Sequence, residues 1–168
     1  MLSVPIRPAT VDDLRAVTGL IERAVRISNA TDYTAEQQMQ VLADYSLPAM
    51  KRRLTRSAAF LVAETPVWAT TERIVSGVAV VVRSRRASAG DVASIEALFV
   101  DPSAQGMGVG GALLDDLVER VSRAGIARIM VSASLTAADF YAHMGFSRLG
   151  RSQSNTGVET VMMERLIG

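Results

Sequence analysis

The segment Gln105-Gly106-Met107-Gly108-Val109-Gly110-Gly111 stands between a β-branched run and an apolar stripe with helical spacing. Four glycines in six positions let several backbone N–H groups approach one anion without obstruction by side chains. The dipole of the helix that follows adds to this attraction. A flexible loop or a single tight turn would need fewer glycines. The segment therefore predicts a binding site for phosphate or pyrophosphate.

Three glycine motifs compete for these letters. The dinucleotide pattern G-x-G-x-x-G begins at Gly106, but five residues separate this glycine from the preceding strand. The next strand ends in Ser-Ala-Ser at residues 132–134 and lacks the acidic residue that would hold a ribose. A P-loop is excluded because no Gly-Lys-Ser/Thr follows. The pattern that remains is Q-x-x-G-x-G, which begins at Gln105.

Hydrophobic periodicity on both sides of the glycine segment alternates between strand and helix patterns. Strands are predicted at residues 6–8, 60–64, 74–82, 93–100, 129–133, 146–149 and 158–166. Helices are predicted at residues 10–27, at 35–44 with 48–54, from the end of the glycine segment to Gly125, and at 137–144. This order predicts one mixed α/β (α+β) domain spanning residues 1–168, without linkers or repeats.

The composition limits the chemistry that the chain can perform. Its 168 residues include 18 basic and 17 acidic side chains, one His and no Cys. A net charge of +1 predicts no general attraction to nucleic acid or to an acidic membrane. Without Cys and with a single His, we expect neither a metal site nor a thiol nucleophile. No signal peptide or membrane-spanning stretch is visible, so we expect a cytoplasmic protein.

In its surroundings the glycine segment resembles the pyrophosphate loop of the GNAT superfamily of acetyl-coenzyme A-dependent N-acyltransferases. The resemblance covers nearly the whole chain, with matching stretches at residues 6–14, 60–77, 95–102, 137–146 and 163–166. Its most specific part besides the loop is the motif Phe-Tyr-x-x-x-Gly-Phe. The resemblance implies a mixed, mostly antiparallel central sheet of six to seven strands. This sheet would be splayed between its fourth and fifth strands and flanked by about four helices.

The resemblance also implies how acetyl-CoA would be held. The loop amides would bind the pyrophosphate, and the strand before the loop would pair with the pantetheine arm. A backbone N–H near Phe99 or Val100 would polarise the thioester carbonyl. Family members often carry Asn where this chain has Ser134, which predicts a weakened pantetheine contact. The implied cofactor-binding residues are Leu98, Phe99, Val100, Gln105, Gly106, Met107, Gly108, Val109, Gly110, Gly111 and Ser134.

Aminolysis of a thioester needs a base for the amine and an acid for the departing thiolate. Glu96 is the candidate base, directly or through a water, because it is a carboxylate within an apolar strand and is expected on the face of Leu98 and Val100. The alternative is an exposed or Arg-paired carboxylate. The resemblance implies Tyr141 as the acid, since its phenol is protonated at pH 7. The alternative is a packed tyrosine whose hydroxyl is bonded locally.

Two further residues attract attention. His143 is expected on the surface, because it lies two positions after Tyr141 and about 200° around a helix. Trp68 is expected to pack or to line the acceptor cleft. The acceptor site itself is expected near residues 28–54 and 152–157. The acidic side chains of the first region suit a cationic amine, although an exposed helix face would look equally acidic.

These features predict an N-acetyltransferase that moves an acetyl group from acetyl-CoA to a primary amine of a small molecule or peptide. Direct attack in a ternary complex is expected, because no Cys nucleophile is present. The alternative is a non-catalytic CoA- or acyl-CoA-binding sensor or interaction module with the same fold. A homodimer is implied by analogy with the family alone.

Overall fold

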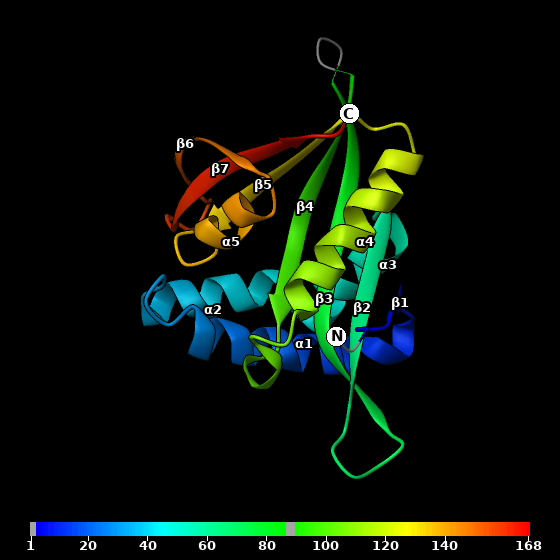
Figure 1. Ribbon diagram of the computed structural model, residues 1–168. Helices are drawn as coiled ribbons and strands as arrows, with labels where there is room; N and C mark the ends of the chain where they lie inside the picture. Colours follow the sequence, from blue (N-terminus) through cyan, green and yellow to red (C-terminus); the bar gives the residue numbers. More distant parts are fainter. Residues whose placement is uncertain (1–2, 87–89) are drawn as a thin grey trace.

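A seven-stranded sheet runs through the part of the chain that the computed structural model describes, residues 3–86 and 90–168. The strands lie in the order β1-β2-β3-β4-β5-β7-β6 (Figure 1). Their bounds are Ile6–Pro8 (β1), Ala59–Pro66 (β2), Arg73–Arg86 (β3), Gly90–Val100 (β4), Arg128–Ser134 (β5), Ser147–Gln153 (β6) and Glu159–Leu166 (β7). Only β4 and β5 pair in parallel, and the other described neighbours are antiparallel. The predicted mixed, mostly antiparallel sheet is confirmed.

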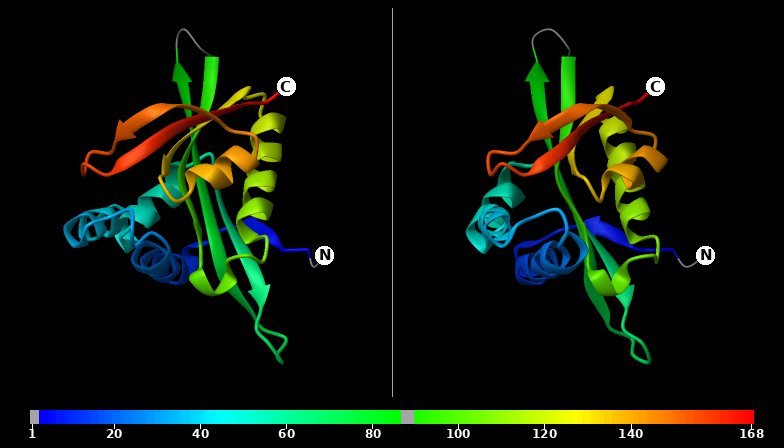
Figure 2. Two further views of the ribbon diagram at one scale, coloured as in Figure 1. Left: turned by 60° about the vertical axis from the view of Figure 1, so that its left-hand side comes forward. Right: turned by 90° about the vertical axis from the view of Figure 1, so that its left-hand side faces the viewer.

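Helices cover both faces of this sheet, as the right-hand view of Figure 2 shows. The α-helices are Leu14–Arg23 (α1), Ala35–Asp44 (α2), Leu47–Arg56 (α3), Val109–Arg123 (α4) and Ala138–His143 (α5). The short segments are Val11–Asp13 (η1), Ala24–Ser28 (η2, a π-helix) and Pro102–Ala104 (η3). Because side chains alternate along β3, Val78 and Val80 pack toward α1 and α3, whereas Ala79 and Val81 pack toward α4. The sheet thus separates two apolar cores.

The β3–β4 pair and the edge strand β6 extend beyond the stretches predicted from periodicity. The β3–β4 hairpin is longer at its outer end, where polar residues such as Arg83 and Asp91 form an ion pair across the ladder. Edge strand β6 is mostly exposed and carries no buried face. Hydrophobic alternation reports burial rather than backbone pairing, so it misses strands or strand ends without a core-facing side.

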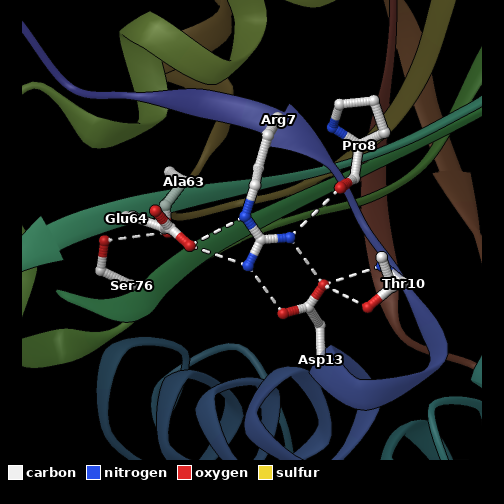
Figure 3. A network of polar contacts seen from close by, with 7 residues as sticks. All are labelled: Arg7, Pro8, Thr10, Asp13, Ala63, Glu64 and Ser76. Carbon is white, nitrogen blue, oxygen red and sulfur yellow. Dashed lines mark hydrogen bonds and ion pairs between the residues drawn. The ribbon is translucent and has the colours of Figure 1, made fainter. Parts of the chain in front are cut away.

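A polar network joins the first strand to the first helical turn (Figure 3). The Arg7 guanidinium donates to both carboxylate oxygens of Asp13 at 2.8 Å, and its Nε donates to Glu64 Oε1 at 2.8 Å. Asp13 also accepts the backbone N–H of Thr10 at 2.8 Å. Together these hydrogen bonds anchor β1 against β2 and orient the entry into α1.

The sheet opens between its fourth and fifth strands. β4 pairs with β5 only over residues 93–95, opposite residues 129–131. Beyond Ile95, β4 continues to pair with β3 on one edge and leaves its other edge without a strand partner. This splay confirms the expected architecture and creates the opening in which the site lies. Among the described residues, no helix is both long and apolar enough to cross a membrane.

Candidate functional site

A cavity of about 480 Å³ lies where β4 leaves β5. Its wall combines the end of β4, the η3–α4 loop, the first turn of α4, η2 and the start of α5. The predicted residues on this wall are Leu98, Phe99, Val100, Gln105, Gly106, Gly108, Val109, Gly110, Gly111 and Tyr141. Met107, Ser134 and Glu96 do not line it. The fold therefore brings the glycine segment, the preceding strand and the late tyrosine to one place.

The glycine loop has the geometry of an anion cradle. Gly106 and Gly108 adopt positive φ angles of 77° and 81°, which side chains other than glycine rarely tolerate. A Cβ added at either position, or at Gly111, would meet no atom within 4 Å, so the space around the loop is open. Within the described residues, five N–H groups donate to no protein backbone acceptor, namely those of Gly106, Gly108, Val109, Gly110 and Gly111. An anionic group in front of the loop would satisfy them.

The free edge of β4 supplies a second row of backbone groups. Asp101 N donates to Ser76 O at 2.8 Å, so the backbone groups of the residue that follows β4 point toward β3. Because this direction alternates, Phe99 faces β3, whereas Leu98 and Val100 turn their N–H and C=O toward the opening. The loop and this edge together fit a ligand that carries both a pyrophosphate and an extended, amide-containing arm. Coenzyme A has this chemistry.

Glu96 does not lie on the predicted face of β4. Val80 is opposite Ala97 and Val81 is opposite Ile95, so Glu96 is the extra residue of a β-bulge. The bulge interrupts the alternation and turns the Glu96 side chain toward α3, whereas Leu98 and Val100 pack on the α4 side. The expectation of a shared face is therefore wrong.

The Glu96 carboxylate is paired in this position. It accepts hydrogen bonds from Arg53 Nε at 3.0 Å and from Arg56 Nη2 at 3.2 Å. Its backbone carbonyl accepts the Tyr45 hydroxyl at 2.7 Å. An Arg-paired carboxylate was the alternative interpretation of this residue, and it matches the observed contacts.

Tyr141 is buried and is one of the residues that line the cavity. The ring packs edge-to-face against Phe140 and Phe146, with centroids 5.3 Å apart in each pair. Among the described residues, no group forms a hydrogen bond with the Tyr141 hydroxyl. Burial raises the pKa of this hydroxyl, so it stays protonated well above neutral pH. A buried phenol facing a cavity without a local partner is suited to donate to a ligand.

Ser134 lies behind the wall instead of on it. Its hydroxyl accepts Asn29 Nδ2 at 3.2 Å and Ala137 N at 3.3 Å. Beside it, Asp32 accepts the Thr136 hydroxyl at 2.7 Å. These contacts join the η2–α2 segment to the β5–α5 loop across the opening. Asn29 lies within the expected acceptor region, but its contact with Ser134 and the place of Thr136 were not predicted, because contacts between residues more than 100 positions apart leave no local pattern.

Two other expectations have different outcomes. His143 is exposed, as predicted, and its Nδ1 lies 2.8 Å from Asp139 O. The expectation for Trp68 is wrong, since 93% of this residue is exposed. It lies in the turn between β2 and β3, which extends away from the core in Figure 1. Of the expected acceptor region, residues 28–29 line the cavity and residues 152–157 do not.

Solved structures share this architecture. A GCN5-related N-acetyltransferase from Rhodopseudomonas palustris is 22% identical, with a TM-score of 0.81 over 99% of this chain and 98% of that chain. The PaiA N-acetyltransferase of Thermoplasma acidophilum, solved in complex with coenzyme A, is 17% identical, with a TM-score of 0.77 over 99% of this chain and 100% of that chain. These identities establish the fold alone. A search of curated proteins finds no match.

The family assignment rests on sequence and agrees with the fold. The profile of the acetyltransferase (GNAT) domain covers the chain from the end of η2 to the last strand. It therefore includes the splayed strands, the glycine loop and the late tyrosine. Because it matches residues 29–167, the chain belongs to the GNAT acetyltransferase family.

Proposed function

We propose that this protein is an N-acetyltransferase that moves an acetyl group from acetyl-CoA to a primary amine of a small molecule or peptide by direct attack. The observation that carries the proposal is a single cavity with three features. It combines a glycine loop with unpaired N–H groups, a free strand edge and a buried tyrosine hydroxyl without a local partner. The coenzyme A bound to the Thermoplasma neighbour agrees with this assignment.

In this proposal the chain holds the cofactor mainly through its backbone. The five unpaired N–H groups of the glycine loop, between Gly106 and Gly111, bind the pyrophosphate. Met107 supplies none of them, because its N–H donates to Ala104 O at 3.4 Å and its side chain is exposed. Leu98 and Val100 pair with the pantetheine amides as a further strand would. Gln105 keeps the loop near η2, because its side chain donates to the Ser28 hydroxyl. Ser134 contributes indirectly, through Asn29.

When bound, acetyl-CoA supplies an activated acetyl thioester. The N–H of Val100 would stabilise negative charge on the carbonyl oxygen, and it suits this task better than that of Phe99, which faces β3. The Tyr141 hydroxyl would protonate the departing thiolate. Among the residues that the structure describes, no carboxylate or imidazole lines the cavity, so Glu96 would receive the proton of the amine only through a water.

The decisive experiment follows thiol release from acetyl-CoA across a panel of primary amines. Tyr141→Phe should lower kcat about 100-fold, because the acid for the thiolate is lost. It should leave unchanged the rise in melting temperature caused by coenzyme A. Tyr33→Phe is the control for loss of a phenol hydroxyl, since Tyr33 is half-buried and does not line the cavity. Its kcat should stay within about twofold.

Each result has a distinct meaning. If Tyr141→Phe retains full kcat, the assignment of the acid is wrong. If Glu96→Gln retains full activity across pH, water alone is the base. A non-catalytic sensor would gain stability from coenzyme A without releasing thiol for any amine. Failure of coenzyme A to raise the melting temperature would refute the role of the glycine loop.

A further inference from the structure

A second hollow lies at the junction of α2 and α3, separate from the cavity described above. Its volume is about 420 Å³, and it shares no wall residue with the first cavity. Ala43, Asp44 and Ala49 form part of the wall, and the guanidinium-bearing residues Arg52, Arg53 and Arg56 form the rest. Three arginines from two turns of one helix thus surround a single concave space.

The charges of this hollow are not balanced within the described residues. Glu96, which does not line the hollow, pairs with Arg53 and Arg56, and Asp44 is the carboxylate on the wall itself. Among the described residues no acidic partner faces Arg52. Arg52 and Arg56 also stand four positions apart on α3, where like charges repel each other. Three guanidinium groups against two carboxylates leave an excess positive charge in the hollow.

Arg53 is held rigidly, whereas Arg56 contacts Glu96 through Nη2 alone and keeps its other N–H groups free of any acidic partner among the described residues. Arg53 Nε donates to Glu96 at 3.0 Å and Arg53 Nη1 donates to Asp44 O at 2.5 Å. The Arg53 guanidinium lies 5.0 Å from the centre of the Tyr45 ring, and its side chain is 15% exposed. The Arg56 side chain is 57% exposed, and Arg52 is exposed as well. Planar guanidinium groups presented in this way match the oxygens of carboxylates and phosphates.

We propose that this hollow binds a carboxylate or phosphate group through Arg52 and Arg56, beside Arg53, which the ion pair with Glu96 holds in place. Packed rings lie between the hollow and the first cavity. Tyr45 carries Arg53 on its face and packs edge-to-face on Phe99 at 5.1 Å, and Phe99 lines the first cavity. This position suits an anionic group on the acceptor amine itself, an assignment that rests on the proposed function. Anion binding in the hollow does not rest on it.

Binding is tested on the full chain by titration with inorganic phosphate and with acetate at constant ionic strength. Saturating coenzyme A is present throughout, so that the added phosphate cannot bind at the glycine loop and contribute to the thermal shift. The variants are Arg52→Ala and Arg56→Ala. The matched control is Arg123→Ala, which removes an exposed arginine from the last turn of α4, where Arg123 pairs with Glu119. Thermal shift gives the affinity, and the side-chain Nε–H resonances of the arginines give the location.

The wild type and the Arg123→Ala control should bind phosphate equally, and each α3 variant should bind it about tenfold more weakly. The Nε–H resonances of Arg52 and Arg56 should move during the titration. Equal affinity in the α3 variants and the control would overturn the proposal, as would resonances that stay in place. Circular dichroism confirms that each variant is folded. Arg52→Lys keeps the positive charge and tests whether the two parallel hydrogen bonds of a planar guanidinium group are required.

A kinetic comparison identifies the source of the anion. Linear primary amines with and without a terminal carboxylate are compared as acceptors. If the anion belongs to the acceptor, the carboxylate should lower KM about tenfold, and Arg52→Ala should abolish this advantage. The alternative is that phosphate changes the rate with an amine that lacks a carboxylate and does not compete with that amine. The hollow would then hold a separate anionic effector. Absence of all acetyl transfer would refute the proposed function and leave the phosphate titration intact as a test of the hollow.

Discussion

At the scale of single residues, Tyr45 connects the helical layer to the bulge of β4. Its hydroxyl donates to Glu96 O at 2.7 Å, and its ring packs on Phe99. Burial raises the pKa of Tyr45 to about 12, so the hydroxyl remains a donor at every pH used for activity measurements. The bulge is the point at which β4 separates from β5, and Tyr45 satisfies the carbonyl that it exposes.

Tyr45→Phe should therefore leave a partly buried carbonyl unsatisfied. The free energy of unfolding, measured with urea, should fall by about 1–2 kcal/mol. The kcat of acetyl transfer should fall as well, because the bulge positions Leu98 and Val100. A variant with unchanged stability and unchanged kcat would show that the bulge keeps its shape without this hydrogen bond.

Asp13 makes stability depend on pH in the acid range. The pKa of Asp13 lies below its ordinary value of 3.8 because Arg7 donates hydrogen bonds to its carboxylate, which outweighs the opposing effect of burial. A carboxyl group with a lower pKa in the folded state stabilises the protein above its unfolded pKa. That contribution is lost as the pH falls through the folded value.

We expect Asp13→Asn to lower the free energy of unfolding by about 2 kcal/mol at pH 7. The difference from wild type should shrink progressively below pH 4, because the wild-type carboxylate is then protonated. Urea unfolding at several pH values measures both. A difference that stays constant down to pH 2 would contradict the role of the ionised pair with Arg7.

At the scale of elements, α4 has a positive-φ glycine near each end, and the two have different tasks. Gly108 is the residue before the helix, with φ 81°, and Gly125 follows it, with φ 72°. At both positions an added Cβ would meet open space. Only Gly108 borders the cavity. Substitutions at these two glycines therefore distinguish the effect of backbone strain on stability from an effect on ligand binding.

Gly108→Ala and Gly125→Ala should each cost about 1–2 kcal/mol of stability, because alanine is strained in the left-handed region. Only Gly108→Ala should also weaken coenzyme A binding, by about tenfold or more, since it strains the positive-φ turn of the loop that lines the cavity. Calorimetric titration measures the affinity. Equal losses of affinity in both variants would mean that loop geometry matters less than overall stability.

At the scale of the whole molecule, the sheet consists of two halves that are joined weakly. In the described part of the chain, strands β1–β4 pair with strands β5–β7 through three residues on each side. The Asn29–Ser134 and Asp32–Thr136 contacts join segments across the opening elsewhere. A ligand seated between the halves should stabilise both, because it bonds groups that water otherwise solvates.

Coenzyme A should therefore slow amide hydrogen exchange at Leu98, Val100 and the glycine loop by at least about tenfold. Exchange at the far edge, in β1 and its partner β2, should change less. Mass spectrometry of peptides with and without coenzyme A measures the effect. Protection confined to β1 and β2 would place the ligand somewhere other than the splay.

Much of the architecture and part of the site were predictable from local patterns. The glycine spacing and the Phe-Tyr-x-x-x-Gly-Phe motif predicted a loop and a tyrosine that the structure places on one cavity wall. Apolar periodicity located the buried strands and helices. It missed the outer part of β3–β4 and most of β6, because exposed strands have no core-facing side.

What the sequence determined by itself is local: glycines that free the backbone, helix and strand periodicity, and the absence of thiols. Tertiary structure alone decided the orientation of Glu96, since one extra residue in β4 reverses the face of every side chain beyond it. It likewise placed Arg53 and Arg56 against that carboxylate and Asn29 against Ser134. Such pairings depend on strand register and helix docking between residues far apart in the chain, and no local spacing encodes them.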